Sequence, residues 1–235
     1  MSSNQQTKRN ARRVARARQR LIIRIAGFIL VGLAVVVIFI IITLVKGPKT
    51  TNQNPIGRGP MPALVGTKQY SSAPPMLVDL AKQYFATFQM EKGGEFVIQL
   101  YPDKAPVTVN SFVFLANQGY FNGVSFHRVL PGFMAQGGDP TGSGSGGPGY
   151  SFVNESNDLA FDKAGVVAMA NAGRDTNGSQ FFITFGPVGL SESDYTIFGQ
   201  VISGMDVVNK ITLRDPSQNP SFIGDIIKNV SITIK

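Results

Sequence analysis

The chain of 235 residues is long enough for one well-buried domain with additional segments, and its lack of cysteine excludes a disulfide framework, a thiol nucleophile and a cysteine-held zinc site. Its single histidine excludes a histidine-rich metal site, and no cluster of carboxylates indicates a metal, so we expect neither a metal nor another cofactor. The formal net charge is +8, but residues 1–24 hold eight of the 22 lysines and arginines and no acid, so the remainder is formally neutral and nucleic-acid binding by it is not expected.

A long apolar run follows this basic tail. Residues 25–45, IAGFILVGLAVVVIFIIITLV, contain no charged side chain. A helix of roughly 20 apolar residues crosses the hydrocarbon layer of a bilayer, so we predict a single transmembrane helix here. A cleaved signal peptide is the alternative, but its apolar region spans only about 7–15 residues and is followed by a small-x-small cleavage site, which is missing here. We therefore expect an uncleaved signal-anchor.

The flanking charges predict the orientation of this helix. Arginines are dense on its N-terminal side, whereas only Lys46 and Lys49 follow it closely. By the positive-inside rule, residues 1–24 are a cytoplasmic tail, and the rest of the chain lies outside the cytoplasm at the cell membrane. The alternative for the tail is a nucleic-acid-binding arm, but basic segments beside a membrane span are expected from orientation and anionic lipids alone.

Residues 46–78 have the composition of a linker. They carry six of the 14 prolines and no acidic residue, and they show little sustained hydrophobic periodicity. This composition predicts a semi-extended tether that holds the following domain away from the membrane surface. The alternative is that the segment becomes ordered against a partner.

From residue 79 onwards, short strand-like runs alternate with turns. The predicted strands are residues 84–90, 95–101, 124–130, 133–139, 165–171, 179–185, 195–202 and 226–235. Helical spacing of apolar residues predicts a helix over 105–119, and a second short helix is expected near 205–212. This pattern predicts a mainly β domain over residues 79–235, built as a closed barrel with helices at its ends.

Three motifs in this domain carry a family resemblance. They are FHRVLPGFMAQGGDP at 126–140, MANAGRDTNGSQFFIT at 169–184 and YTIFGQV at 195–201. In this order and spacing they closely resemble the cyclophilin family of peptidyl-prolyl cis/trans isomerases, from about residue 84 to the C-terminus. The resemblance implies an eight-stranded antiparallel β-barrel capped by two helices, and proline-containing polypeptides as substrates.

The resemblance also implies roles for individual residues. Arg128 matches the catalytic arginine, and Gln136 matches the residue that helps to orient it. The implied substrate-binding positions are His127, Phe133, Met134, Ala170, Asn171, Phe182, Leu190 and Tyr195. Of these, Asn171 would act through main-chain groups, and Tyr195 stands where many eukaryotic members have histidine. On pattern alone, the apolar members would be read as core residues and Arg128 as part of a surface ion pair.

The chemistry of prolyl isomerisation favours Arg128 over His127 as the reactive group. Rotation about a peptide bond is opposed by about 18–20 kcal/mol of amide resonance, and no bond is made or cut. As the amide twists, its nitrogen regains a lone pair, to which a permanently charged guanidinium can donate a hydrogen bond. We therefore expect His127 to belong to the wall of the site, with proton transfer as the alternative.

Together these features predict a membrane-tethered peptidyl-prolyl isomerase that assists the folding of exported or membrane proteins. The alternative is a non-catalytic peptide-binding or assembly subunit that uses the same groove to join a membrane complex. The presence together of Arg128, Phe133, Gln136 and Phe182 favours the enzyme, since a scaffold has no need of the arginine.

Overall fold

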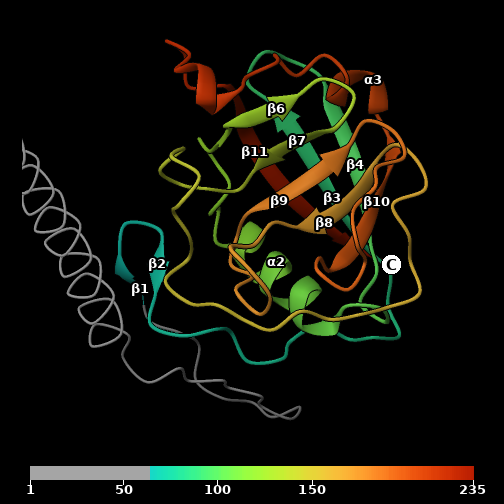
Figure 1. Ribbon diagram of the computed structural model, residues 1–235. Coiled ribbons are helices and arrows are strands. Elements are labelled where there is room, and N and C mark those ends of the chain that lie inside the picture. The colour runs from blue at the N-terminus through green and yellow to red at the C-terminus, as the bar shows by residue number, and fades with distance from the viewer. Residues whose placement is uncertain (1–63) are drawn as a thin grey trace, which may run out of the picture. The chain divides into compact units, whose positions relative to one another are not determined.

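The computed structural model describes residues 64–235 of the chain (Figure 1). Its elements in chain order are β1 (Leu64–Gly66), β2 (Gln69–Tyr70), β3 (Tyr84–Met90), β4 (Glu95–Leu100), α2 (Pro106–Asn117), β5 (Ser125–Phe126), β6 (Arg128–Leu130), β7 (Met134–Gly137), β8 (Val166–Met169), β9 (Phe181–Thr184), β10 (Ile197–Ser203), α3 (Met205–Val208), the 3-10 helix η1 (Pro216–Gln218) and β11 (Asp225–Ile234). The predicted tail (1–24) and transmembrane helix (25–45) lie outside the described residues. Within residues 64–235, no helix combines the length and the apolar character that crossing a membrane requires.

The main sheet is antiparallel and nearly closes on itself. Its strand order is β5-β11-β3-β4-β10-β8-β9-β7-β6, so β5 and β6 form its two edges. In the chain these two edge strands are separated by His127 alone, and the sheet must therefore curl to bring its two edges close together. Figure 1 shows the curled sheet. This is the barrel that the sequence predicted, with α2 and α3 near opposite ends.

The main sheet has nine strands, whereas eight were expected. The single strand expected over 124–130 changes partners at His127. Its first part pairs with β11, where Phe126 opposes Asp225, and its second part pairs with β7, where Arg128 opposes Gln136. A strand that leaves one neighbour for another must break its ladder at the crossover, and the carbonyl of His127 accepts its hydrogen bond from the guanidinium of Arg214.

The interior of the barrel is filled by side chains. Alternate residues of β3 and β4 point inwards, including Phe88 and Phe96, whose rings stack at 4.7 Å. Phe181 lies at the centre of an aromatic group and contacts the rings of Phe88, Phe112, Phe121 and Phe126. Aromatic side chains bury large areas and pack edge to face, so this barrel is a solid core that supports a site on its outside.

The folded part of the chain begins before the boundary expected at residue 79. Tyr70 and Val78 are buried members of the main core. The side-chain amide of Asn110 on α2 accepts hydrogen bonds from the backbone N–H groups of Leu77 (2.8 Å) and Val78 (3.2 Å) and donates one to the carbonyl of Pro75 (2.9 Å). Residues 67–78, which we call the N-terminal strap, therefore pack along the domain, although they were expected to form the end of a linker.

Candidate functional site

Arg128 and Gln136 face each other on neighbouring strands. They are direct register partners on β6 and β7, and residues opposite each other in an antiparallel pair project to the same face. The half-buried guanidinium of Arg128 donates a long hydrogen bond of 3.4 Å from Nη1 to Oε1 of Gln136. Its Cζ also lies 5.9 Å from the ring centroid of Phe133. The sheet thus brings together the two residues to which the resemblance assigned catalysis, and places a cation beside an aromatic ring.

An apolar cluster separate from the main core lies next to this pair. Its buried members are Met134, Phe161, Val166, Ala168, Phe182 and Ile197, and its partly buried members are Phe133, Leu159, Ala170, Val188, Leu190 and Tyr195. All six apolar and aromatic residues that the resemblance placed in the substrate site belong to this one cluster. Met134 and Phe182 are buried in it, at 2% and 3% exposure, whereas the partly buried members leave part of the cluster open to solvent.

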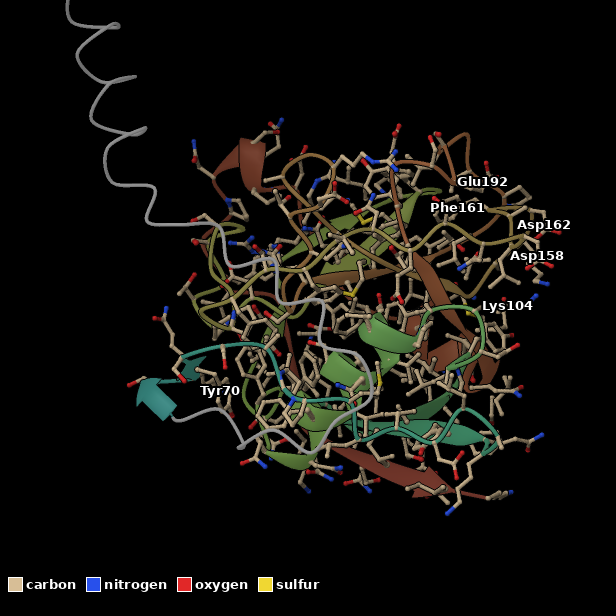
Figure 2. The ribbon with its side chains drawn as sticks, turned by 90° about the horizontal axis from the view of Figure 1, so that it is seen from below. Tyr70, Lys104, Asp158, Phe161, Asp162 and Glu192 are labelled. Atoms are coloured by element: carbon tan, nitrogen blue, oxygen red, sulfur yellow. The ribbon has the colours of Figure 1, made fainter. Side chains whose placement is uncertain are left out.

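Three aromatic rings give this cluster its shape. The ring of Phe182 stacks on Phe161 at 5.8 Å and meets Tyr195 edge to face at 5.6 Å. Phe161 and Tyr195 are also in edge contact, at 6.4 Å. Phe161 was not predicted, because its stretch DLAFDK carries no motif; in the view of Figure 2 it lies on the same side as Glu192. Mutually packed rings have few alternative rotamers, so the cluster offers a rigid apolar surface.

The side chain of His127 lies beneath a glycine-rich segment, where it has little surface to offer a substrate. It is 1% exposed, and a Cβ at Gly144 would lie 3.8 Å from its Nε2. Within residues 64–235, neither imidazole nitrogen makes a hydrogen bond of normal geometry. Burial lowers the pKa of His127, and the charges of Arg214 and Arg128 act in the same direction against Asp139 and the Ser125 backbone. The imidazole is therefore neutral near pH 7, and its place is structural, at the break between β5 and β6.

Gln180 extends the site beyond the residues that were predicted. Nε2 of Gln136 donates to Oε1 of Gln180 at 2.9 Å, and Nε2 of Gln180 donates to the carbonyls of Gly144 (3.0 Å) and Gly146 (2.9 Å). Arg128 is thus connected through two amides to the segment 138–149, which we call the Gly-rich loop. The sequence held one signal for this role, because Gln180 precedes Phe182 by two residues and so shares its face of the strand.

The Gly-rich loop is organised around the carboxylate of Asp139, which is buried. This carboxylate accepts backbone N–H groups from Thr141 (2.7 Å), Gly144 (2.6 Å) and Gly146 (3.1 Å). Burial alone would raise the pKa of Asp139, but these hydrogen bonds and the Thr141 hydroxyl outweigh it, and the pKa is lowered. The acid has a structural task, and within residues 64–235 no three His, Asp or Glu side chains gather as metal ligands.

Asn171 fixes a second loop, the one that leads into Tyr195 of the cluster. Its side-chain Nδ2 donates to the carbonyl of Asp194 at 2.8 Å, next to Tyr195, and its Oδ1 accepts from the N–H of Gly173 at 3.1 Å. Asn154 donates to the same carbonyl, also at 2.8 Å. The side chain of Asn171 is thus occupied within the protein, and any contact with a substrate falls to its main-chain groups.

Comparisons with known proteins show which proteins this chain resembles. The family described as cyclophilin type peptidyl-prolyl cis-trans isomerase/CLD matches residues 85–232. Peptidyl-prolyl cis-trans isomerase-like 1 of Mus musculus is 45% identical over 137 residues, which cover 57% of this chain and 82% of that protein. Peptidyl-prolyl cis-trans isomerase B of Bacillus subtilis is 41% identical over 146 residues, which cover 62% of this chain and 95% of the relative.

Solved structures lead to the same fold. The crystal structure of a cyclophilin type peptidyl-prolyl cis-trans isomerase from Cryptosporidium parvum matches with a TM-score of 0.58 and 32% identity, covering 64% of this chain and 98% of that one. A second structure of that protein, in the presence of the dipeptide Ala-Pro, matches with a TM-score of 0.58 and 33% identity, covering 63% and 98%.

Proposed function

The chain belongs to the family of cyclophilin-type peptidyl-prolyl cis-trans isomerases, and from this premise we propose that Arg128 is its catalytic residue and that the cluster around Phe182 takes the proline ring. The observation that carries the proposal is the placing of a half-buried guanidinium beside an apolar cluster of six partly buried and six buried side chains. An apolar surface next to a cation suits a twisted prolyl amide, because the ring is apolar and the twisted nitrogen accepts a hydrogen bond.

The proposed mechanism acts on the transition state of rotation. The rigid rings hold the pyrrolidine while the carbonyl on its N-terminal side rotates. As resonance is lost, the amide nitrogen gains a lone pair, and Arg128 donates a hydrogen bond to it more strongly than to the planar amide. Gln136 holds the guanidinium in direction, and the apolar surroundings strengthen the contact by excluding water. No proton is transferred, so the neutral, buried His127 is not required.

We propose further that the enzyme is tethered to the cell membrane by residues 25–45 and acts outside the cytoplasm on exported or membrane proteins. The support for this is the uncharged run of that segment and the basic residues before it. The Ala-Pro dipeptide in the Cryptosporidium parvum structure supports proline-containing polypeptides as the substrates here as well.

Replacement of Arg128 tests the catalytic proposal. We expect the full-length Arg128→Ala variant to lose about 10²–10³-fold in kcat/KM on an Ala-Pro peptide in a protease-coupled assay, because one preorganised donor is removed. Arg128→Lys should recover only part of the activity, since a flexible ammonium does not reproduce the planar donor. Arg174→Ala is the matched control, because this exposed arginine forms an ion pair with its neighbour Asp175 at 3.9 Å and was assigned no role in the site. Full activity of Arg128→Ala would refute the assignment.

A further inference from the structure

The N-terminal strap contacts the end of the Gly-rich loop through Tyr70. The backbone N–H of Tyr70 donates to the carbonyl of Pro148 at 2.8 Å. Its ring, 7% exposed, meets Phe114 of α2 edge to face at 4.9 Å. Gly149 has a φ of +90°, and a Cβ there would lie 2.6 Å from the Tyr70 carbonyl oxygen. The close approach of strap and loop therefore needs glycine at 149. Figure 2 shows Tyr70, the last residue of β2, on the opposite side of the view from Phe161.

The strap also reaches the other end of the loop, through Tyr120. Nζ of Lys68 donates to the carbonyl of Asn122 at 2.5 Å and lies 5.9 Å from the ring centroid of Tyr120. The hydroxyl of Tyr120 is hydrogen-bonded to that of Ser179 at 2.9 Å, and the Ser179 hydroxyl donates to the carbonyl of Gly138 at 2.7 Å. Both ends of the loop are thus linked to the same short segment of chain.

The strap acts on the end of the loop that Asp139 does not hold. Residues 138–149 contain six glycines and no strand or helix. Asp139 fixes the part of the loop up to Gly146, whereas Pro148 and Gly149 rest against the strap. The carbonyls of Gly144 and Gly146 are the acceptors for the amide of Gln180, whose own carbonyl oxygen accepts from Gln136. Gly146 is only two residues from Pro148, so a shift at the strap end of the loop would act on the amides that direct Arg128.

We propose that the N-terminal strap is part of the working enzyme and that Tyr70 is a positioning residue, which fixes the Gly-rich loop and, through Gln180 and Gln136, the direction of Arg128. The inference rests on the proposed catalytic role of Arg128. It assigns to a segment outside the matched family region, which begins at residue 85, a part in the reaction.

A graded series at Tyr70 tests this inference. In the full-length chain, we expect Tyr70→Ala to lower kcat about three- to tenfold on an Ala-Pro peptide, with KM changed less than about twofold. The effect falls on kcat because Arg128 stabilises the twisted transition state more than the bound planar substrate. Tyr70→Leu, which keeps an apolar side chain against Phe114, should lie between Tyr70→Ala and the wild type. All three variants keep the backbone N–H that donates to Pro148, and only Tyr70→Phe also keeps the ring against Phe114, so it should show the wild-type kcat. Exchange NMR at several substrate concentrations separates kcat from KM.

Val208→Ala is the matched control for a purely structural loss. Val208 is fully buried on α3, away from the loop, so its truncation should lower the free energy of unfolding and leave kcat unchanged. Wild-type kcat in both Tyr70→Ala and Tyr70→Leu would overturn the inference, as would a rise in KM alone. If Tyr70→Ala does not fold, Tyr70→Leu decides. Loss of activity in Arg128→Ala with none in the Tyr70 series refutes only the role of the strap, whereas an active Arg128→Ala refutes the proposed function itself.

Discussion

At the scale of single residues, His127 should make the stability of the domain depend on pH. Its pKa in the folded protein lies below the ordinary value of about 6.5, chiefly because it is buried. The unfolded chain therefore binds the proton first, so the stabilisation is complete above pH 6.5 and is lost as the pH falls from there towards the folded pKa. We expect the free energy of unfolding, measured by urea denaturation, to decrease between about pH 7 and pH 5.

His127→Phe provides the control for this effect. The imidazole nitrogens make no hydrogen bond of normal geometry within the described part of the chain, so an apolar ring of similar shape leaves no partner unsatisfied. Because His127 is the only histidine in the sequence, the variant should show almost no change in unfolding free energy over the same range. An equal pH dependence in the variant would show that another group is responsible.

At the scale of elements, α2 depends on a cap from a distant loop. The helix begins at Pro106, and Ala105 before it provides no side-chain cap. Instead, the carboxylate of Glu155 accepts the N–H groups of Val107 (2.9 Å) and Thr108 (2.8 Å), and the Thr108 hydroxyl at 2.7 Å. These are N–H groups that a helix start leaves unpaired, and the negative charge also suits the helix dipole.

Removal of this cap should destabilise the domain without touching the candidate site. We expect Glu155→Ala to lower the free energy of unfolding by about 1–2 kcal/mol, the usual cost of losing an N-terminal cap. Glu192→Ala is the control, since Glu192 is exposed (Figure 2) and should change the free energy of unfolding by less than about 0.5 kcal/mol. Thermal or urea unfolding measures both. Equal effects of the two substitutions would mean that the cap contributes nothing.

The elements that the sequence predicted are those whose signal is local. Alternation in β3 and β4 and the helical spacing of α2 are properties of a few neighbouring residues, and the structure confirms these elements at the expected places. The break at His127 was missed because 124–130 reads as one strand, and only the closing of the barrel forces it to change partners. Glu155 caps a helix 47 residues away, and Gln180 and Tyr70 act through loops, so no local pattern reports their contacts.

The site was predicted from sequence motifs, because burial and composition alone do not identify it. The apolar cluster of Met134 and Phe182 has the same composition as a core, and burial alone does not separate the two. The apolar cluster differs from a core because β6 places Arg128 beside it. Arg128 was predicted from the motif at residues 126–140. The motifs therefore predicted six of the twelve members of the cluster, whereas the amide relay from Arg128 to the Gly-rich loop needed the fold.

At the scale of the whole molecule, the membrane tether is the remaining prediction. The uncharged run of residues 25–45 should hold the full-length chain in the membrane fraction after alkaline carbonate extraction. An inserted apolar helix is held by its contacts with the lipid hydrocarbon, and not by ion pairs that this treatment breaks. A variant lacking residues 1–45 keeps the strap and the domain and should be recovered in the soluble fraction with unchanged kcat/KM on an Ala-Pro peptide.

The orientation of the tether is tested by protease accessibility in intact cells or spheroplasts. We expect protease added outside to degrade the domain but to leave a tag placed before residue 1, because the arginines before residue 25 retain the N-terminus in the cytoplasm. Replacing the arginines of residues 1–24 by glutamine is the matched variant, and it should weaken this orientation while leaving the hydrophobic run unchanged. Carbonate release of the full-length chain would refute the anchor, whereas a protected domain would refute only its orientation.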